Sequence, residues 1–468
     1  MKINWKILLL FFTPILATIL TFVYNESIIK LILVPLIIIY IYVYVIRCNI
    51  IKYMSSGIGL CLNILIFIRY LFIPFLIIID SEYMNNIVLS YGNPNSMYFV
   101  YGVILTLYES VFVGMYLIHN ISTLCSVEYY QEEKVVVNNV KNCKFKKTSN
   151  LFIIFCIFVF IALVLFCDSS VVKRWNLVFL LNDSTVVYLN SVTSLRTTIA
   201  LISFRNILLL LPIPFLSLIH GSLYDVKNDK KSYIKTIVTL IGCYGLLIEG
   251  TSRASAIIPL IATLVCLMKL YPKKKKTTII YIGTLLISVI IISTIWKSYS
   301  RLGKDATMSL DDFLEMLEIY FQGISNMGKA LMAKIDSGII LPRIDYLLND
   351  LITTIPLISH LSNINDTATA QFWAYTGGRK DQVLSAIGGG LFYFGYLLSP
   401  FVCIFQIKVA SIFEKKANNA KSIGKFLVCT YASLMLIYGC YSSVVIFIQK
   451  LILSSAISVI ISSINEKV

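Results

Sequence analysis

The chain has 468 residues, of which 58% are hydrophobic and 14% are charged, and its mean hydropathy is +0.82. These values exclude a set of soluble domains as well as the collagenous, disordered and disulfide-scaffold classes, and they predict an integral membrane protein. The net charge of +16 does not indicate a nucleic-acid partner, because the lysines lie in short clusters between apolar runs, as in cytoplasmic loops.

About twelve apolar runs have a length suited to a membrane-crossing helix, with both termini on the inner side. The first run follows Lys2 and Lys6 in the manner of a signal peptide, but it is long and no small-residue cleavage site follows, so we expect a retained span. The predicted spans are 7–23, 28–46, 58–79, 98–118, 151–167, 199–219, 234–249, 254–271, 278–296, 388–408, 426–447 and 451–464.

These spans predict an all-α, polytopic membrane protein in three parts. Residues 1–296 hold the amino-terminal spans and residues 388–468 hold the carboxy-terminal spans. Residues 297–387 form an outer segment that is longer than a connector needs to be, and we expect a large, partly helical loop folded onto the bundle. Within it, apolar residues recur at helical spacing over 310–324, which predicts an amphipathic helix on the membrane surface or over a cavity mouth.

The arginines are distributed unequally between the two sides. Only Arg47 falls in an inner segment, whereas the other arginines lie within spans or outside: Arg69, Arg174, Arg196, Arg205, Arg253, Arg301, Arg343 and Arg379. A guanidinium offers a planar fork of donors that matches phosphate oxygens. This pattern indicates that a phosphate or diphosphate is handled on the outer side, the alternative being pairing with carboxylates or lipid headgroups.

Arg69 and Arg205 lie within predicted spans, where a charge needs a wet cavity or a partner. Glu109 is the natural counter-ion for one of them, so a purely structural ion pair is the alternative to a functional site. Arg253 follows Gly250, Thr251 and Ser252 in a predicted outer turn, where free backbone N–H groups favour anions.

The stretch 373–381 combines several features of a binding site. Trp373 and Tyr375 have aromatic faces on which a sugar ring can stack. Gly377 and Gly378 let the backbone approach a ligand, and Arg379 supplies charge. Gly390, in a run of glycines at the entrance of the next span, permits either loop flexibility with close backbone approach or close helix packing.

The end of the long outer segment resembles the O-antigen and capsular repeat-unit polymerases of the Wzy type. The resemblance lies in Gly377-Gly378-Arg379, followed by Gly390 and the aromatic run 391–396. Thr251-Ser252-Arg253 resembles the small-residue and arginine signature that those proteins carry earlier in the chain. The resemblance implies a GT-C-like fold in the bacterial inner membrane, with the active site facing the periplasm. The implied reaction is metal-independent transfer of a glycan from undecaprenyl diphosphate to another lipid-linked repeat unit.

The resemblance also implies site residues and partners. Arg253 and Arg379 match the arginines that hold the diphosphate, with Arg69, Arg196, Arg205 and Arg301 in support. The expected partners are an undecaprenyl-diphosphate-linked oligosaccharide and membrane lipid, and a chain-length regulator is left open. No metal or other cofactor is expected, since the eleven cysteines lie in apolar runs or inner loops without CxxC or Cys/His spacing.

The general base is the least determined part of the predicted site. His360 is favoured because related ligases use a loop histidine, and Asp366 and Asp381 are the next candidates. Two other functions stay open: a lipid-linked oligosaccharide flippase or secondary transporter, and an O-antigen ligase, which keeps the fold and changes the acceptor. The absence of an internal sequence repeat weighs against a transporter built from duplicated halves.

Overall fold

The structure is a computed structural model, and it describes most of the central and carboxy-terminal chain. The described residues are 57–79, 97–124, 154, 157–158, 161, 175–177, 195–220, 230–245, 247–249, 254–302, 310–353, 365–377, 383–440, 448, 451–452, 455–456 and 458–463. Within them the chain is almost wholly helical, apart from one short two-stranded ribbon. The predicted all-α class is confirmed, and the predicted spans 7–23 and 28–46 lie outside the described residues.

The first described helices agree with two predicted spans. The span 58–79 is helical throughout, as α3 (Gly57–Phe67), the π-helix η1 (Ile68–Phe72) and α4 (Ile73–Ile79). The span 98–118 is the long helix α6 (Met97–Leu124). The π-turns matter because they change the direction of side chains such as that of Arg69 relative to a regular α-helix.

Two predicted spans in the middle of the chain are interrupted. The span 199–219 breaks at Leu211 between α11 (Leu195–Leu210) and α12 (Pro212–His220), because Pro212 disfavours helical backbone at the residue before it. The span 234–249 ends early, since α13 (Lys230–Tyr244) stops at Gly245. Residues beyond it form the strand β2 (Leu247–Glu249), which pairs antiparallel with β1 (Trp175–Leu177).

A sharp turn connects the next two helices at the predicted inner side. α14 (Ala254–Leu270) leads through the short 3-10 helix η4 (Pro272–Lys274) into α15 (Lys275–Leu302), with a bend of 119° between residues 256–270 and 272–289. Proline at the first position of η4 suits a helix start, since its missing N–H would have no helical partner there.

The described part of the segment that follows α15 is largely helical. It forms α16 (Leu310–Phe321), α17 (Ile324–Asp336), α18 (Ile344–Thr353) and α19 (Ala368–Tyr375). We call the described residues 310–353 and 365–377 the outer lobe. The amphipathic helix predicted at 310–324 is confirmed over 310–321 as α16, whose Leu314 is buried and which packs against η1, α4 and α17. The prediction was too long at its end, because the chain turns at Gln322 and Gly323 and Ile324 begins α17.

The carboxy-terminal helices complete the bundle. They are α20 (Ala386–Leu398), α21 (Phe401–Asn418) and α22 (Ile423–Cys440). α22 is the central helix of the core, because α3, α12, α14 and α21 all pack against it. The predicted single span 388–408 is wrong in shape: α20 and α21 meet at a bend of 110°, where Pro400 begins the second helix.

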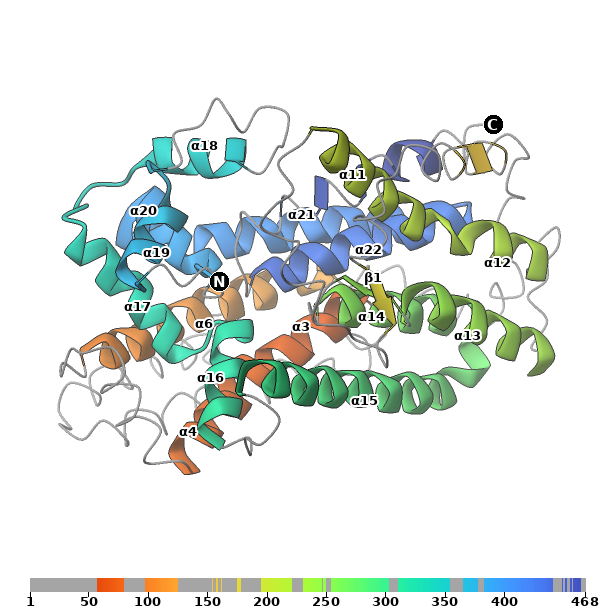
Figure 1. Ribbon diagram of the computed structural model, residues 1–468, viewed down its shortest axis with the longest axis horizontal. Coiled ribbons are helices and arrows are strands. Elements are labelled where there is room, and N and C mark those ends of the chain that lie inside the picture. Colours follow the sequence, from red (N-terminus) through yellow and green to blue (C-terminus); the bar gives the residue numbers. More distant parts are fainter. Residues whose placement is uncertain are drawn as a thin grey trace, which may run out of the picture.

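The three predicted parts of the chain are not structurally separate. The boundary at 297 falls inside α15, and the boundary at 387 falls inside α20. α17 of the outer lobe packs against α6 and α20, so the lobe shares the core of the bundle. Figure 1 shows α17, α18, α19 and α20 together at one end of the molecule, with the α14–α15 and α21–α22 turns toward the other end.

The lysine clusters meet at that other end. Ser232 of α13 lies 2.9 Å from the Tyr271 hydroxyl, and Lys274 lies 4.7 Å from the centre of the Tyr233 ring. Lys269 lies 6.0 Å from the Phe426 ring centre, which joins this group to the start of α22. The structure thus places Lys230 and Lys231 and the predicted inner clusters at 273–276 and 415–425 on one end, while Lys227 and the cluster at 141–147 lie outside the described residues.

Among the described residues, Ile423–Cys440 is the one helix long and apolar enough to cross a membrane unaided. The two bent pairs, α14 with η4 and α15, and α20 with α21, raise this number to three if each pair counts as one span. The predicted total of about twelve spans therefore stays a prediction.

Candidate functional site

A buried ion pair joins the first described helices of the bundle. Arg69 Nη2 lies 2.6 Å from Glu109 Oε2, and both side chains are buried. The Tyr70 hydroxyl donates to the same carboxylate oxygen at 2.9 Å. Glu109 is therefore the counter-ion of Arg69 rather than of Arg205, one of the two alternatives that the sequence left open.

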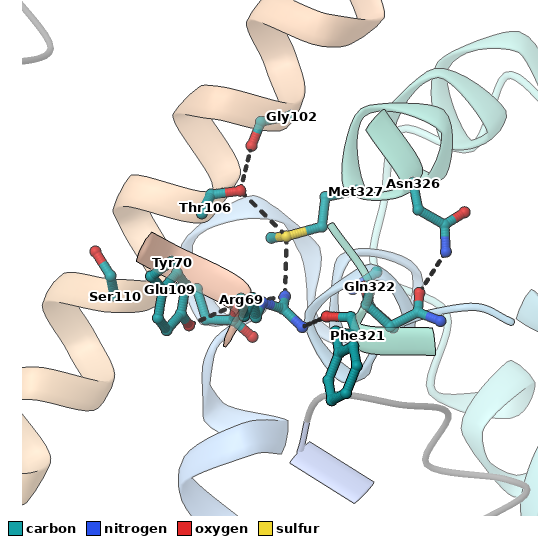
Figure 2. A network of polar contacts seen from close by, with 12 residues as sticks. Arg69, Tyr70, Gly102, Thr106, Glu109, Ser110, Phe321, Gln322, Asn326 and Met327 are labelled. Atoms are coloured by element: carbon teal, nitrogen blue, oxygen red, sulfur yellow. Dashed lines mark hydrogen bonds and ion pairs between the residues drawn. The ribbon is translucent and has the colours of Figure 1, made fainter. Parts of the chain in front are cut away.

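The same guanidinium reaches the outer lobe. Arg69 Nη1 donates to the backbone carbonyl of Phe321 at 3.2 Å, and Nη2 lies 2.9 Å from Met327 Sδ (Figure 2). Phe321 is the last residue of α16, where carbonyl groups have no helical partner and carry partial negative charge. One cation thus neutralises a carboxylate of α6 and caps a helix end of the lobe.

The α16–α17 junction is held in a tight turn by a second buried carboxylate. Glu318 Oε1 accepts the backbone N–H of Ser325 at 3.1 Å, and Glu318 Oε2 accepts the Ser325 hydroxyl. Gln322 has φ of 53°, and Gly323 leaves no room for a Cβ, which would lie 2.8 Å from the Glu318 side chain. A carboxylate at the start of α17 satisfies helix N–H groups and suits the positive end of its dipole.

Gly102 lets this junction lie directly on α6. A Cβ at position 102 would be 1.9 Å from the carbonyl oxygen of Ile324, so only glycine permits the observed contact. Thr106 lies one turn further along α6 and donates to Met327 Sδ at 3.3 Å. α6 therefore receives the junction by shape at Gly102 and by polar contacts at Thr106 and Glu109.

This geometry changes the interpretation of Arg69. We predicted that it supports binding of a diphosphate, but its charge is neutralised by Glu109 and its side chain is buried among protein atoms. The placement favours the structural alternative, an Arg–Glu pair that holds the outer lobe on the bundle. Arg205 is half-buried in α11, which packs against α12, α13 and α22, whereas η1 with Arg69 packs against α3, α4 and α16.

A groove of about 540 Å³ lies in the outer lobe where α17 turns into α18. It is lined by Ser337, Gly338, Ile339, Ile340, Leu341, Arg343, Tyr346 and Gln371. The backbone permits this turn because Gly338 adopts φ of 66°, in the left-handed region that favours glycine. The lining combines an arginine, a tyrosine and an amide with aliphatic side chains, which suits an amphipathic ligand.

Arg343 is the charged residue of the groove, and it is held in place by its neighbours. Its Nε and Nη2 donate to the carboxylate of Asp345 at 2.6 to 3.0 Å. The guanidinium carbon lies 4.4 Å from the centre of the Tyr346 ring. These hydrogen bonds raise the pKa of Arg343 and lower the pKa of Asp345, so both groups keep their charge at neutral pH.

Asp350 connects three helices of the outer end. Its Oδ2 accepts the Tyr393 hydroxyl of α20 at 2.6 Å and the backbone N–H of Ala368, the first residue of α19, at 3.1 Å. Burial raises the pKa of the Asp350 carboxyl, although the hydrogen bonds from Tyr393 and Ala368 act in the opposite direction. Lys334 lies nearby, where its ammonium group donates to the Leu391 carbonyl and burial lowers its pKa.

Asp366 is the one predicted general base that the structure describes. It is half-buried in the turn before α19, and its backbone carbonyl accepts the Asn349 amide at 3.0 Å. Asp366 is the smallest of the contributions that raise the pKa of Arg343, after those of Asp345 and Tyr346. It is not among the residues that line the groove.

The aromatic and glycine predictions have different outcomes. Trp373 and Tyr375 are half-buried on α19 and pack on the core of the outer end. Gly377 adopts φ of 66° where α19 ends, which is the usual helix-terminating role of glycine. The prediction that Gly390 gives loop flexibility is wrong: it lies inside α20, and a Cβ there would be 2.2 Å from the Ser399 carbonyl oxygen.

The remaining predicted site residues, or their side chains, lie outside the described part of the chain. His360, Asp381, Arg253, Arg379 and Gly378 lie outside the described residues. Arg196 and Arg301 lie in α11 and α15, but the description of these helices does not extend to their side chains.

The sequence did not single out the groove around Arg343. Arg343 was counted among the outer arginines, but Tyr346, Gln371 and Asp350 carried no recognisable motif. The available signal was the order Gly338, Pro342, Arg343, Asp345, in which turn residues precede an arginine and a carboxylate.

No cluster of three or more histidine, cysteine or carboxylate side chains suited to a metal ion occurs within the part of the chain that the structure describes. Comparison with known proteins adds no relative: no protein-family model, curated protein or solved structure matches this chain.

Proposed function

We propose that this protein is an integral-membrane polysaccharide polymerase, a glycosyltransferase that moves a growing glycan from a lipid diphosphate to another lipid-linked repeat unit. The observation that carries the proposal is the outer lobe. It is a compact helical element with an arginine-containing groove, at the end of the molecule away from the lysine clusters (Figure 1). The resemblance of residues 251–253 and 377–396 to the Wzy-type polymerases supports the same function.

The chemistry of such a transfer fits the kinds of residue found at this end. A hydroxyl oxygen of the acceptor sugar forms a bond to the anomeric carbon of the donor, and the bond from that carbon to the diphosphate oxygen breaks. The electron pair leaves with the diphosphate, whose growing negative charge fixed arginine donors can stabilise. The hydroxyl proton passes to a general base.

Under this proposal the roles of the residues follow their placement. Arg253 and Arg379 bind the diphosphate, with Arg196, Arg205 and Arg301 in support, and Trp373 and Tyr375 contact sugar. His360 is the favoured base, and Asp366 and Asp381 are the alternatives. Arg69 positions the outer lobe and does not contact the substrate.

The experiment is chain extension by the purified protein in lipid nanodiscs. Lipid-diphosphate-linked repeat units are supplied, and the products are separated by length. The wild type is expected to form long chains, whereas Arg253→Ala and Arg379→Ala are expected to form none. Arg→Lys at either position should restore little activity if two phosphate oxygens are held at once, since an ammonium group lacks the planar fork.

Lys416→Ala is the matched control, because Lys416 is exposed at the lysine-rich end and its loss removes one positive charge without touching the outer lobe. It should extend chains as the wild type does. Normal chain length in Arg253→Ala and Arg379→Ala would remove these residues from the proposed site.

Two other functions are distinguished by the same assay. A flippase would move lipid-linked repeat units across the nanodisc or vesicle bilayer without producing longer glycans. A ligase would transfer the glycan once to a different acceptor, so that the linkage in the product identifies it. Failure of the wild type to extend chains with any lipid-linked repeat unit would contradict the proposed polymerase.

A further inference from the structure

Four aliphatic side chains are exposed where α17 turns into α18. Ile340 and Leu341 are 81% and 74% exposed in the turn, and Ile344 and Leu348 are 58% and 55% exposed on α18. The last two lie one helical turn apart and so share a face. We call these four residues the elbow patch. A contiguous apolar patch of this kind marks a surface that another apolar surface covers.

The elbow patch adjoins the exposed apolar face of α20 and α21. Arg343 donates its backbone N–H to the Phe392 carbonyl at 2.9 Å, and a Cβ at Gly395 would lie 3.3 Å from Pro342 Cγ. Beyond Gly395 the exposed hydrophobic residues continue along the two helices. They are Tyr396, Leu397, Leu398, Phe401 and Phe405.

This neighbouring surface belongs to a candidate membrane-crossing element. α20 and α21 together are long and apolar enough to cross a bilayer as a bent pair. Their exposed aromatic and aliphatic side chains then contact lipid acyl chains. Because α18 packs beside α20 (Figure 1), a bilayer that covers the α20–α21 face also meets the elbow patch.

Asp336, at the end of α17, is an exposed charged residue beside the elbow, whereas four others are paired or turned inward. Asp350 of α18 turns inward to Tyr393 and the start of α19. Arg343 and Asp345 neutralise each other at the edge of the patch, a position that suits the headgroup region. Lys334 is buried, with its ammonium group on the Leu391 carbonyl and the Tyr396 ring.

We propose that the elbow patch is set into the outer leaflet of the membrane, in contact with phospholipid acyl chains, while Arg343 and Asp345 lie at the level of the hydrated headgroups. The segment expected from the sequence to be an outer loop thus contains a membrane-embedded elbow. This inference rests on the membrane location included in the proposed function, but it requires neither the transfer reaction nor the identity of the substrate.

The test is photo-crosslinking in nanodiscs of a phospholipid that carries a diazirine within its acyl chain. Adducts are mapped by mass spectrometry of proteolytic peptides. We expect adducts on residues 339–348 and also on the exposed face of α21 at Phe401 and Phe405, which acts as an internal reference for lipid contact. Ser232, at the lysine-rich end, should carry none.

A variant sharpens the test. In Ile340→Glu/Leu341→Glu the adducts on the elbow should fall by roughly tenfold, because a charged side chain is strongly disfavoured in hydrocarbon, while those on α21 stay unchanged. Ile340→Ala/Leu341→Ala is the matched control, which shortens both side chains without adding charge and should keep the adducts.

The outcomes separate this inference from the proposed function. Adducts on α21 without adducts on the elbow would overturn the inference and leave the membrane location standing. Adducts on neither would overturn the inference together with the membrane location. An elbow that is shielded from lipid because a second copy of the chain covers it, seen as a doubled mass in the nanodisc, would also overturn it.

Discussion

Two arginine–carboxylate pairs in this protein have the same closest distance and opposite surroundings. Arg69 and Glu109 lie 2.6 Å apart, as do Arg343 and Asp345. The side chains of the first pair are 1% and 0% exposed, whereas those of the second are 43% and 51% exposed. The first joins residues forty positions apart and reaches a third segment at Phe321, and the second joins residues two positions apart.

The comparison shows that the distance between two charges does not by itself determine how much an ion pair contributes to the stability of the fold. In the buried pair each charge depends on the other, because no water replaces a lost partner. In the exposed pair water solvates either charge, and side-chain entropy offsets much of the attraction. The buried pair therefore helps to hold the outer lobe on the bundle, beside the packing of α17 on α6 and α20. The exposed pair orients the Arg343 guanidinium beside the groove.

The largest effect is expected from breaking the buried pair. Arg69→Met leaves the Glu109 carboxylate buried without its cation and removes the donor to the Phe321 carbonyl. The free energy of unfolding should fall by about 3–5 kcal/mol, measured by chemical denaturation in detergent micelles. The outer lobe should also become sensitive to protease before the bundle does.

The double variant Arg69→Met/Glu109→Leu is the control for that loss. It removes both charges, so most of the stability should return, since apolar replacements of a buried pair are often neutral. If Arg69→Met alone unfolded like the wild type, the buried pair would not hold the lobe.

Gly102→Ala should have the next largest effect, because it tests the shape of the same contact without touching a charge. The new Cβ would clash with the Ile324 carbonyl oxygen at the start of α17, and overpacking of this kind costs about 1–3 kcal/mol. The lobe should again loosen, as seen in faster hydrogen exchange of α17.

Gly283→Ala in α15 provides the matched control, since no atom lies within 4 Å of a Cβ placed there. This change should stabilise the protein by up to about 1 kcal/mol, the difference in helix propensity between the two residues. Equal effects of the two substitutions would contradict a specific role for Gly102.

A third prediction concerns the buried carboxyl group of the outer end. The folded-state pKa of Asp350 lies above its unfolded value, so the folded state binds the proton more tightly. The corresponding stability is fully present below the unfolded pKa and is lost as pH rises through the folded pKa. The unfolding temperature should therefore fall as pH rises across that window, and Asp350→Asn should flatten this dependence.

Tyr393→Phe distinguishes the contribution of the Tyr393–Asp350 hydrogen bond to stability from the effect of burying the Asp350 carboxyl group. The variant loses the 2.6 Å contact and should be destabilised by about 1.5 kcal/mol at neutral pH, while burial still raises the Asp350 pKa. If the pH dependence of the unfolding temperature is the same in Asp350→Asn as in the wild type, another group is responsible for it.

The smallest effect is expected from the exposed pair. Arg343→Ala should leave the unfolding temperature unchanged within error, because water replaces the partner of Asp345. Any change should shrink further at high salt, which screens exposed charges. A loss of stability comparable to that of Arg69→Met would contradict the exposed position of this pair.

Several features of the fold could be predicted from the sequence because they depend on neighbours along the chain. The helical spans 58–79 and 98–118 and the amphipathic helix at 310–324 follow from apolar periodicity, and α3, α6 and α16 confirm them. The sequence did not predict the breaks at Leu211 and Pro400, although each involves a proline. The spans were predicted from average hydropathy over many residues, and one proline changes that average very little. The strand β2 was missed because its partner, β1, is remote in sequence.

The candidate site was less predictable, since its contacts join distant segments. The sequence identified Glu109 as a counter-ion but could not choose between Arg69 and Arg205. It could not show that Gly390 packs against Ser399, because a glycine beside a span permits either flexibility or close approach. The groove near Arg343 depends on the fold of α17, α18 and α19 together.

The sequence by itself determined the helical type of this protein's secondary structure, because apolar periodicity acts through each residue's own side chain. It also placed the lysines in clusters between apolar runs. Only the tertiary structure decided which arginine is neutralised in the core and which stays exposed. The reason is that the energy of a charge depends on the groups packed around it, and segments far apart in the chain supply those groups.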